Sequence, residues 1–158
     1  LAYNFPKIAG CTITSQMLEI LARHESFLGV KDSSGDRSNI SSYRAALPDQ
    51  VLLQGNEPLL LESLAAGWNG SISGCANVIP QWLSRLHRGH EEGGDSSTTN
   101  SLIEPVLEAL KSSPQPSTNK AILHRIGILS TQTVRLPHLP TDPSFALQAM
   151  ESRLGVPA

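Results

Sequence analysis

One stretch of the chain decides its fold: residues 27–36 read FLGVKDSSGD. Its first half is short, apolar and partly β-branched, and a polar turn with a glycine closes it, which is typical of a buried strand entering a loop. Lys31 is the last residue of that strand, so we expect its amine to be partly removed from water. Desolvation favours the neutral amine, and a neutral amine beside a carbonyl compound forms a Schiff base.

The order strand, turn, helix recurs on both sides of this stretch, roughly every twenty residues. Strands are predicted at 1–3, 27–31, 50–54 and 70–73, and helices at 15–24, 38–46, 59–66 and 79–90. Such repetition predicts an α/β fold with a parallel sheet, either half of a (β/α)8 barrel or a small open sheet. A polar interval at 93–100 is expected to break the pattern, and helices follow at 102–111, 119–128 and 143–154.

Composition argues against several classes of function. The chain has 158 residues with 12 basic and 14 acidic side chains, and aromatic residues make up only 4%, so no nucleic-acid footprint is predicted. The apolar runs are far shorter than the ~20 residues that cross a bilayer. Cys11 and Cys75 have neither metal-ligand nor disulfide spacing, and residues 87–92 are interpreted as a solvated helix end. We therefore expect a cytoplasmic protein with no metal and no membrane contact.

Tyr3 and Lys31 end two successive predicted strands. Neighbouring parallel strands lie ~4.8 Å apart, so the two side chains are expected within reach of each other. A tyrosine beside an amine is able to move the protons that Schiff-base formation requires. The alternative is a tyrosine that only fills space and a lysine that extends to solvent.

The residues after the strands leave further alternatives open. Asp32 is expected to face away from Lys31 and to cap the next helix, because neighbouring strand residues face opposite sides, although an ion pair of Lys31 with Asp32 or Asp36 is the other interpretation. Gly55 ends the third strand and permits close approach of a ligand, and a simple turn explains it equally well.

Taken together, these residues resemble the dihydrodipicolinate synthase / N-acetylneuraminate lyase family of Schiff-base, pyruvate-handling (β/α)8 enzymes. The resemblance extends over essentially the whole chain and is most specific in the lysine segment. It is carried by residues 3–6 (YNFP) with Gly10, residues 29–36 (GVKDSSGD), Gly55, residues 70–73 (GSIS) with 76–78 (ANV), and residues 134–137 (VRLP).

The resemblance implies roles for particular residues. Lys31 is the expected Schiff-base lysine, Tyr3 the proton donor and acceptor, and Ile72 with Gly55 the lining beside a bound 2-oxo acid. No cofactor is implied, since the covalent intermediate forms with the substrate itself. Dihydrodipicolinate synthases usually have a carboxylate-binding arginine five residues after the tyrosine, where this chain has Ile8. This difference favours an aldehyde partner other than aspartate semialdehyde, and hence a 2-oxo-acid aldolase over a true dihydrodipicolinate synthase.

The family barrel also implies a missing part. Residues 1–92 correspond to the last four βα units of the (β/α)8 TIM barrel and residues 93–158 to a helical C-terminal extension, so we expect a fragment of a longer enzyme. Its partners are then a 2-oxo acid, an aldehyde and the missing N-terminal half-barrel, with a homo-oligomer when complete. The chain alone is expected to be inactive. The competing interpretations are a half-barrel that serves only as a structural or binding module, and an unrelated flavodoxin-like domain whose strand order reverses.

Overall fold

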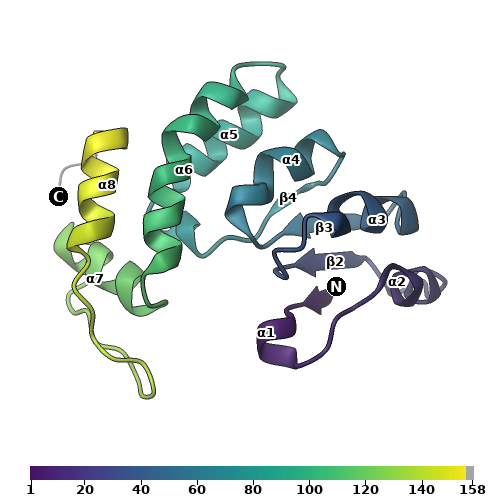
Figure 1. Cartoon of the computed structure of the whole chain (residues 1–158), viewed down its shortest axis with the longest axis horizontal. Helices are drawn as coiled ribbons and strands as arrows, with labels where there is room; N and C mark the ends of the chain where they lie inside the picture. Colours follow the sequence, from purple (N-terminus) through teal and green to yellow (C-terminus); the bar gives the residue numbers. More distant parts are fainter. Residues whose placement is uncertain (156–158) are drawn as a thin grey trace. The chain divides into compact units, whose positions relative to one another are not determined.

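The computed structural model describes residues 1–155 and divides the chain into two compact units, Leu1–Ser73 and Gly74–Ala158. The first unit alternates strands and helices (Figure 1). Its elements are β1 (Ala2–Asn4), α1 (Pro6–Ala9), α2 (Ser15–Leu21), β2 (Gly29–Asp32), α3 (Ser38–Ala46), β3 (Val51–Gln54), the 3-10 turn η1 (Glu57–Leu59), α4 (Leu60–Ala65) and β4 (Gly70–Ser71).

The four strands form one parallel sheet in the order β1-β2-β3-β4, as Figure 1 shows. Sequential order without reversal is the arrangement of a barrel segment, and it excludes the flavodoxin-like alternative. The register aligns Tyr3 with Lys31, and Lys31 with Leu53. These three side chains therefore share one face of the sheet at the same height.

The opposite face of the sheet is buried beneath α2 and α3. Six fully or almost fully buried side chains form its core: Leu18, Val30, Tyr43, Leu47, Leu52 and Trp68. Each buried aliphatic or aromatic side chain contributes roughly 1.5–3 kcal/mol to folding. The Tyr43 and Trp68 rings stack with their centroids 6.4 Å apart, and the Trp68 indole donates to the carbonyl of Ile40 at 3.0 Å. This core holds β2 and β3 rigidly below the face that carries Lys31.

The second unit is helical in its described residues. It contains the 3-10 turn η2 (Cys75–Asn77), α5 (Pro80–Glu91), α6 (Ser96–Ser112), α7 (Ser117–Arg125) and α8 (Ser144–Leu154). Helix α6 packs against both α5 and α8. Their contact buries one apolar stripe from each helix, drawn from Leu83 and Leu86 of α5, Ile103, Val106, Leu107 and Leu110 of α6, and Leu147 and Met150 of α8.

The predicted break in the repeat is confirmed, since α5 ends at Glu91 and only helices follow among the described residues. It is shorter than predicted, because α6 begins at Ser96 and not at residue 102. The carboxylate of Asp95 accepts a hydrogen bond from the Thr98 N–H at 2.8 Å, and the Thr99 hydroxyl donates to the Asp95 carbonyl at 3.2 Å. A capped first turn with a buried Thr99 overrides the weak helix propensity of a serine- and threonine-rich segment. The short helix α1 was also missed, since four residues carry no periodic signal.

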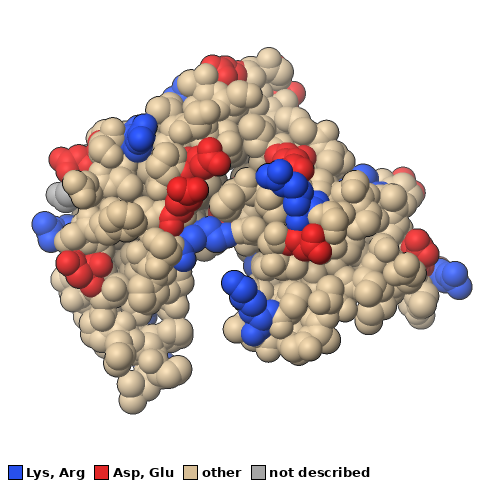
Figure 2. Space-filling model, viewed as in Figure 1, with Lys and Arg blue, Asp and Glu red and all other residues tan. Residues whose placement is uncertain are grey.

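The other predicted helices agree with the structure to within a few residues, and α3 has the predicted limits. The two compact units divide after Ser73. The predicted boundary between residues 92 and 93 is a different one, since it separates the half-barrel from the helical extension, and it stays a prediction. Among residues 1–155 no helix has both the length and the hydropathy that a membrane span needs. On the surface drawn in Figure 2, basic and acidic side chains are interspersed.

Candidate active site

The amine of Lys31 lies beside the hydroxyl of Tyr3. The Nζ atom donates to the Tyr3 hydroxyl at 3.4 Å and lies 4.4 Å from the centroid of the Tyr3 ring. The parallel register between β1 and β2 places the two Cα atoms opposite each other, so both side chains leave the same face of the sheet. Tyr3 is 49% exposed and Lys31 is partly buried, which leaves the amine open to a small molecule. The predicted meeting of Tyr3 and Lys31 is therefore confirmed.

Gly55 forms one wall of the space around the lysine side chain. A Cβ atom at this position would lie 2.8 Å from Cε of Lys31 and 2.0 Å from Oγ of Ser33. Because real Cβ atoms essentially never approach so closely, only glycine lets the Lys31 side chain take its present path. Ser33 follows Lys31 by two residues, and its hydroxyl was not singled out by the sequence pattern.

Ile72 follows β4 and is 49% exposed. Its N–H donates to the carbonyl of Gln54 at 3.1 Å, which continues the β3–β4 ladder by one step. Gly70 pairs with Leu53, so Ile72 belongs to the sheet face that also carries Leu53 and Lys31. The structure thus places Ile72 two strands from Lys31 on the same face, and its role as lining stays a prediction.

Substituting Gly55 with alanine is expected to displace the Lys31 side chain and slow its reaction with pyruvate by roughly tenfold or more. The rate of borohydride trapping measures the effect. Gly74→Ala is the matched control, because a Cβ atom there meets only Nδ2 of Asn119, at 4.0 Å. An unchanged rate in a folded Gly55→Ala variant would contradict the close packing of Gly55 against the lysine.

A buried polar network lies on the reverse side of the sheet, one residue beyond the Tyr3–Lys31 pair. Asn4 Nδ2 donates to Oδ1 of Asp32 and to the Tyr43 hydroxyl, both at 2.9 Å. Asn39 Nδ2 donates to the other carboxylate oxygen of Asp32 at 3.1 Å. The exposed fractions are 0% for Asn4 and 2% for Asp32. The sequence pattern did not predict that Asn4 and Asp32 bond to each other.

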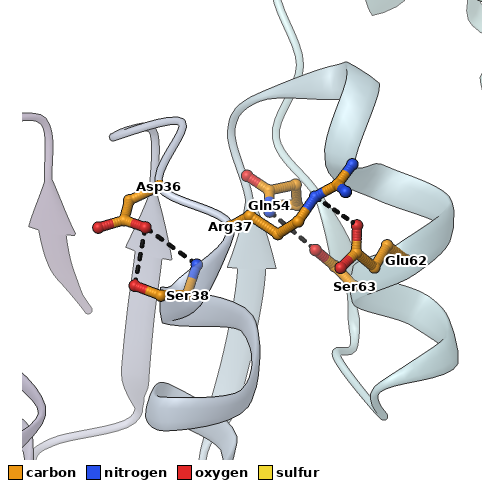
Figure 3. Close-up of polar contacts among 6 residues, drawn as sticks. All are labelled: Asp36, Arg37, Ser38, Gln54, Glu62 and Ser63. Atoms are coloured by element: carbon orange, nitrogen blue, oxygen red, sulfur yellow. Dashed lines mark hydrogen bonds and ion pairs between the residues drawn. The ribbon is translucent and has the colours of Figure 1, made fainter.

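The loop after β2 is closed by its own hydrogen bonds. Asp32 faces away from Lys31 as predicted, but the carboxylate that closes the start of α3 belongs to Asp36. Asp36 accepts from the hydroxyl of Ser38 at 2.7 Å and from its N–H at 2.9 Å (Figure 3), and these bonds lower the pKa of Asp36. The predicted cap by Asp32 is therefore wrong, because Ser34 and Asn39 already occupy its carboxylate.

Two further contacts in Figure 3 attach α4 to its surroundings, one to the start of α3 and one to the end of β3. The guanidinium of Arg37 pairs with the Glu62 carboxylate at 3.0 Å on an exposed surface. Gln54 Nε2 donates to the hydroxyl of Ser63 at 2.8 Å in the interior. The exposed pair adds little stability, whereas the buried amide fixes the end of β3 against α4.

Comparison with known proteins agrees with this geometry. The model of the dihydrodipicolinate synthetase family matches residues 1–152. The chain belongs to this family. The 4-hydroxy-tetrahydrodipicolinate synthase of Hyphomonas neptunium is 32% identical over 154 residues, covering 94% of this chain and 51% of that protein. The corresponding synthase of Wolbachia pipientis is 30% identical over 139 residues, covering 85% and 45%.

Solved structures of the family show the same fold. A putative dihydrodipicolinate synthase from Thermus thermophilus has a TM-score of 0.86 at 28% identity, covering 95% of this chain and 54% of that one. The dihydrodipicolinate synthase from Thermotoga maritima has a TM-score of 0.89 at 23% identity, covering 98% and 55%. The chain spans about half the length of the curated relatives that it matches. Its four parallel strands are thus a half-barrel of the family's TIM-barrel fold.

Proposed function

We propose that Lys31 forms a Schiff base with pyruvate or another 2-oxo acid. One observation carries the proposal: the Lys31 amine and the Tyr3 hydroxyl lie 3.4 Å apart on the open face of the sheet. Membership of the dihydrodipicolinate synthetase family supports this assignment. The protein is then a class I aldolase or lyase when complete.

The chemistry follows from the two groups. The amine of Lys31 adds to C2 of the 2-oxo acid, and the resulting carbinolamine loses water to give an iminium ion. Tyr3 relays one nitrogen proton to the carbonyl oxygen as the carbinolamine forms, and it then gives its own hydroxyl proton to the departing hydroxyl, which leaves as water beside the iminium ion and a Tyr3 phenolate. The iminium then withdraws the electron pair of the adjacent bond, so a carbon–carbon bond at C3 is broken or formed. Gly55 and Ile72 border the bound acid in this proposal.

The choice of aldehyde partner rests on the residue at position 8, which is Ile8. This residue is 78% exposed on α1, and it stands where dihydrodipicolinate synthases usually have an arginine. An isoleucine cannot make the bidentate contact of a guanidinium with a carboxylate. The named relatives are 4-hydroxy-tetrahydrodipicolinate synthases, yet we propose that this protein joins or cleaves a 2-oxo acid and an aldehyde without that carboxylate contact.

Turnover is proposed to need the rest of the barrel. The four strands leave β1 and β4 as edges of the sheet within the described residues, and relatives are about twice as long. A parallel sheet is normally covered on both faces, so we propose an N-terminal half-barrel as partner and a homo-oligomer as the complete enzyme. The half-barrel alone is expected to bind the 2-oxo acid covalently without completing an aldol step.

Borohydride trapping with a set of acids tests the proposal. The chain is incubated with pyruvate and borohydride, and its whole mass is measured over time. A single saturable adduct, reduced in yield by 2-oxobutyrate but not by lactate, would support recognition of a 2-oxo acid. No adduct at any pyruvate concentration would contradict it and favour a half-barrel with a structural or binding role.

Replacing Tyr3 with phenylalanine is expected to slow trapping roughly a hundredfold, because only the proton-transferring hydroxyl is removed. The adduct should still form on long incubation, since the amine remains. Time-resolved mass measurement separates the initial rate from the final yield. A Tyr3→Phe chain that reacts at the wild-type rate would remove Tyr3 from the mechanism.

A further inference from the structure

We infer that the buried network of Asn4, Asp32 and Tyr43 positions the Tyr3 hydroxyl against the Lys31 amine. The inference rests on the proposed function and assigns these three as positioning residues, because they act through the strand ends and lie on the reverse face. Asn4 follows Tyr3 and Asp32 follows Lys31, and the sheet register pairs Asn4 with Asp32 just as it pairs Tyr3 with Lys31.

The carboxylate of Asp32 is surrounded by donors. Oδ1 accepts from Asn4 Nδ2 and from the Ser34 N–H, both at 2.9 Å. Oδ2 accepts from the Ser34 hydroxyl at 3.0 Å and from Asn39 Nδ2 at 3.1 Å. An asparagine in place of Asp32 would point its own NH2 group at two of these donors. The site therefore requires a carboxylate, both of whose oxygens accept hydrogen bonds. Asp32 therefore ties β1, its own loop and α3 to one point.

Asn4 is fixed from the other side by α3 and by the loop before α2. Its amide donates to the Tyr43 hydroxyl, that hydroxyl donates to the carbonyl of Ile13, and the Ile13 N–H donates to Oδ1 of Asn4. Burial, followed by the charges of Asp32 and Asp36, raises the pKa of Tyr43 well above its ordinary value. The Tyr43 hydroxyl thus stays neutral and remains able to donate and accept at once.

These side-chain hydrogen bonds hold the end of β1 against the end of β2. Sheet hydrogen bonds between β1 and β2 are few, because β1 has three residues, and the Ser33 N–H donates to the Asn4 carbonyl at 2.8 Å as the last of them. The side-chain hydrogen bond from Asn4 to Asp32 adds a second attachment between the ends of the two strands. Loss of that attachment frees the end of β1 to shift, and Tyr3 moves with it.

The test compares Asp32→Asn with Asp36→Asn. Both substitutions remove one carboxylate, from the end of β2 or from the loop that follows it, but the Asp36 side chain is exposed and its carboxylate accepts only from Ser38. Pyruvate trapping on Lys31 should slow about tenfold in Asp32→Asn. It should stay within about twofold of wild type in Asp36→Asn. In a Tyr3→Phe background, Asp32→Asn should cause no further loss, because its effect acts through Tyr3.

A nuclear magnetic resonance measurement decides the same point without substrate. Nζ of Lys31 lies over the Tyr3 ring, so the ring current shifts the neighbouring methylene protons upfield. The chain has only four lysines, and Lys7, Lys111 and Lys120 provide internal references. The upfield shift should persist in Asp36→Asn and disappear in Asp32→Asn. If wild type shows the shift but traps no pyruvate, the proposed function fails while the positioning inference still stands.

A folded Asp32→Asn chain that keeps both the upfield shift and the trapping rate would overturn the inference. An equal loss of rate in the wild-type and Tyr3→Phe backgrounds would also overturn it, because the effect would not pass through Tyr3. Should Asp32→Asn fail to fold, Tyr43→Phe replaces it. This variant removes one hydroxyl and no charge, and an unchanged lysine shift together with an unchanged trapping rate would refute the inference.

Discussion

Replacing Lys31 with alanine is expected to abolish the covalent adduct with pyruvate altogether. The chain contains no other lysine on the open face of β1 to β4, since Lys7 lies on α1 and the other two are in the second unit. The fold should persist, because the Lys31 amine makes only exposed contacts with Tyr3, a 3.4 Å hydrogen bond and a cation–π contact worth about 0.5–1 kcal/mol. Whole-chain mass after borohydride reduction measures the result.

Lys120→Ala is the control for this substitution. Its amine donates to the carbonyl of Thr133 at 2.9 Å, so it too is a lysine held by a hydrogen bond, but it belongs to the second unit. Lys120→Ala should yield the wild-type adduct. A persistent adduct in Lys31→Ala would show that trapping reports on surface amines, and the assignment of Lys31 would be wrong.

Replacing Gly29 with alanine is expected to have the largest effect on stability. A Cβ atom there would lie 1.9 Å from the Val51 carbonyl oxygen and 2.7 Å from its carbon, which are backbone atoms of the neighbouring strand. Gly29 also has a φ of 145°, a conformation that an L-residue rarely adopts. Strain and overpacking together should lower the free energy of unfolding by about 3 kcal/mol or more.

Denaturant unfolding followed by Trp68 fluorescence measures this loss. Trp68 is buried in the first unit, and a Trp82→Phe background removes the only other tryptophan of the chain. Gly10→Ala serves as control, because Gly10 belongs to the same unit and has a φ of 70° but nothing within 4 Å of a Cβ atom. It should cost only about 1–2 kcal/mol. Equal losses at Gly29 and Gly10 would contradict the close approach of β2 to β3.

The sheet was predictable because its signals are local. Each strand is a short apolar run that ends in a glycine or polar turn, and the repeated order of strand and helix fixes a parallel arrangement. Tyr3 and Lys31 were found for the same reason, since both end predicted strands and parallel strands bring such ends together; the observed strands continue by one residue, to Asn4 and Asp32. The polar start of α6 was missed because Asp95 and the buried Thr99 act through capping and packing, which composition does not express.

The network behind the site was harder to foresee. Asn4, Asp32 and Tyr43 are separated by up to 39 residues, and nothing in their individual positions indicates that they bond to one another. Asparagine and aspartate after a strand are ordinarily turn residues, so the local pattern favoured a helix cap. Only the register of β1 on β2 shows that both side chains point to the same buried spot.

Peptide mapping of the wild-type chain after reduction with pyruvate and borohydride shows whether Lys31 is the nucleophile for a 2-oxo acid. We expect the added mass on the peptide containing Lys31, and fragmentation should place it on that side chain. An adduct spread over Lys7, Lys111 and Lys120 in proportion to their exposure would show that Lys31 is not the nucleophile.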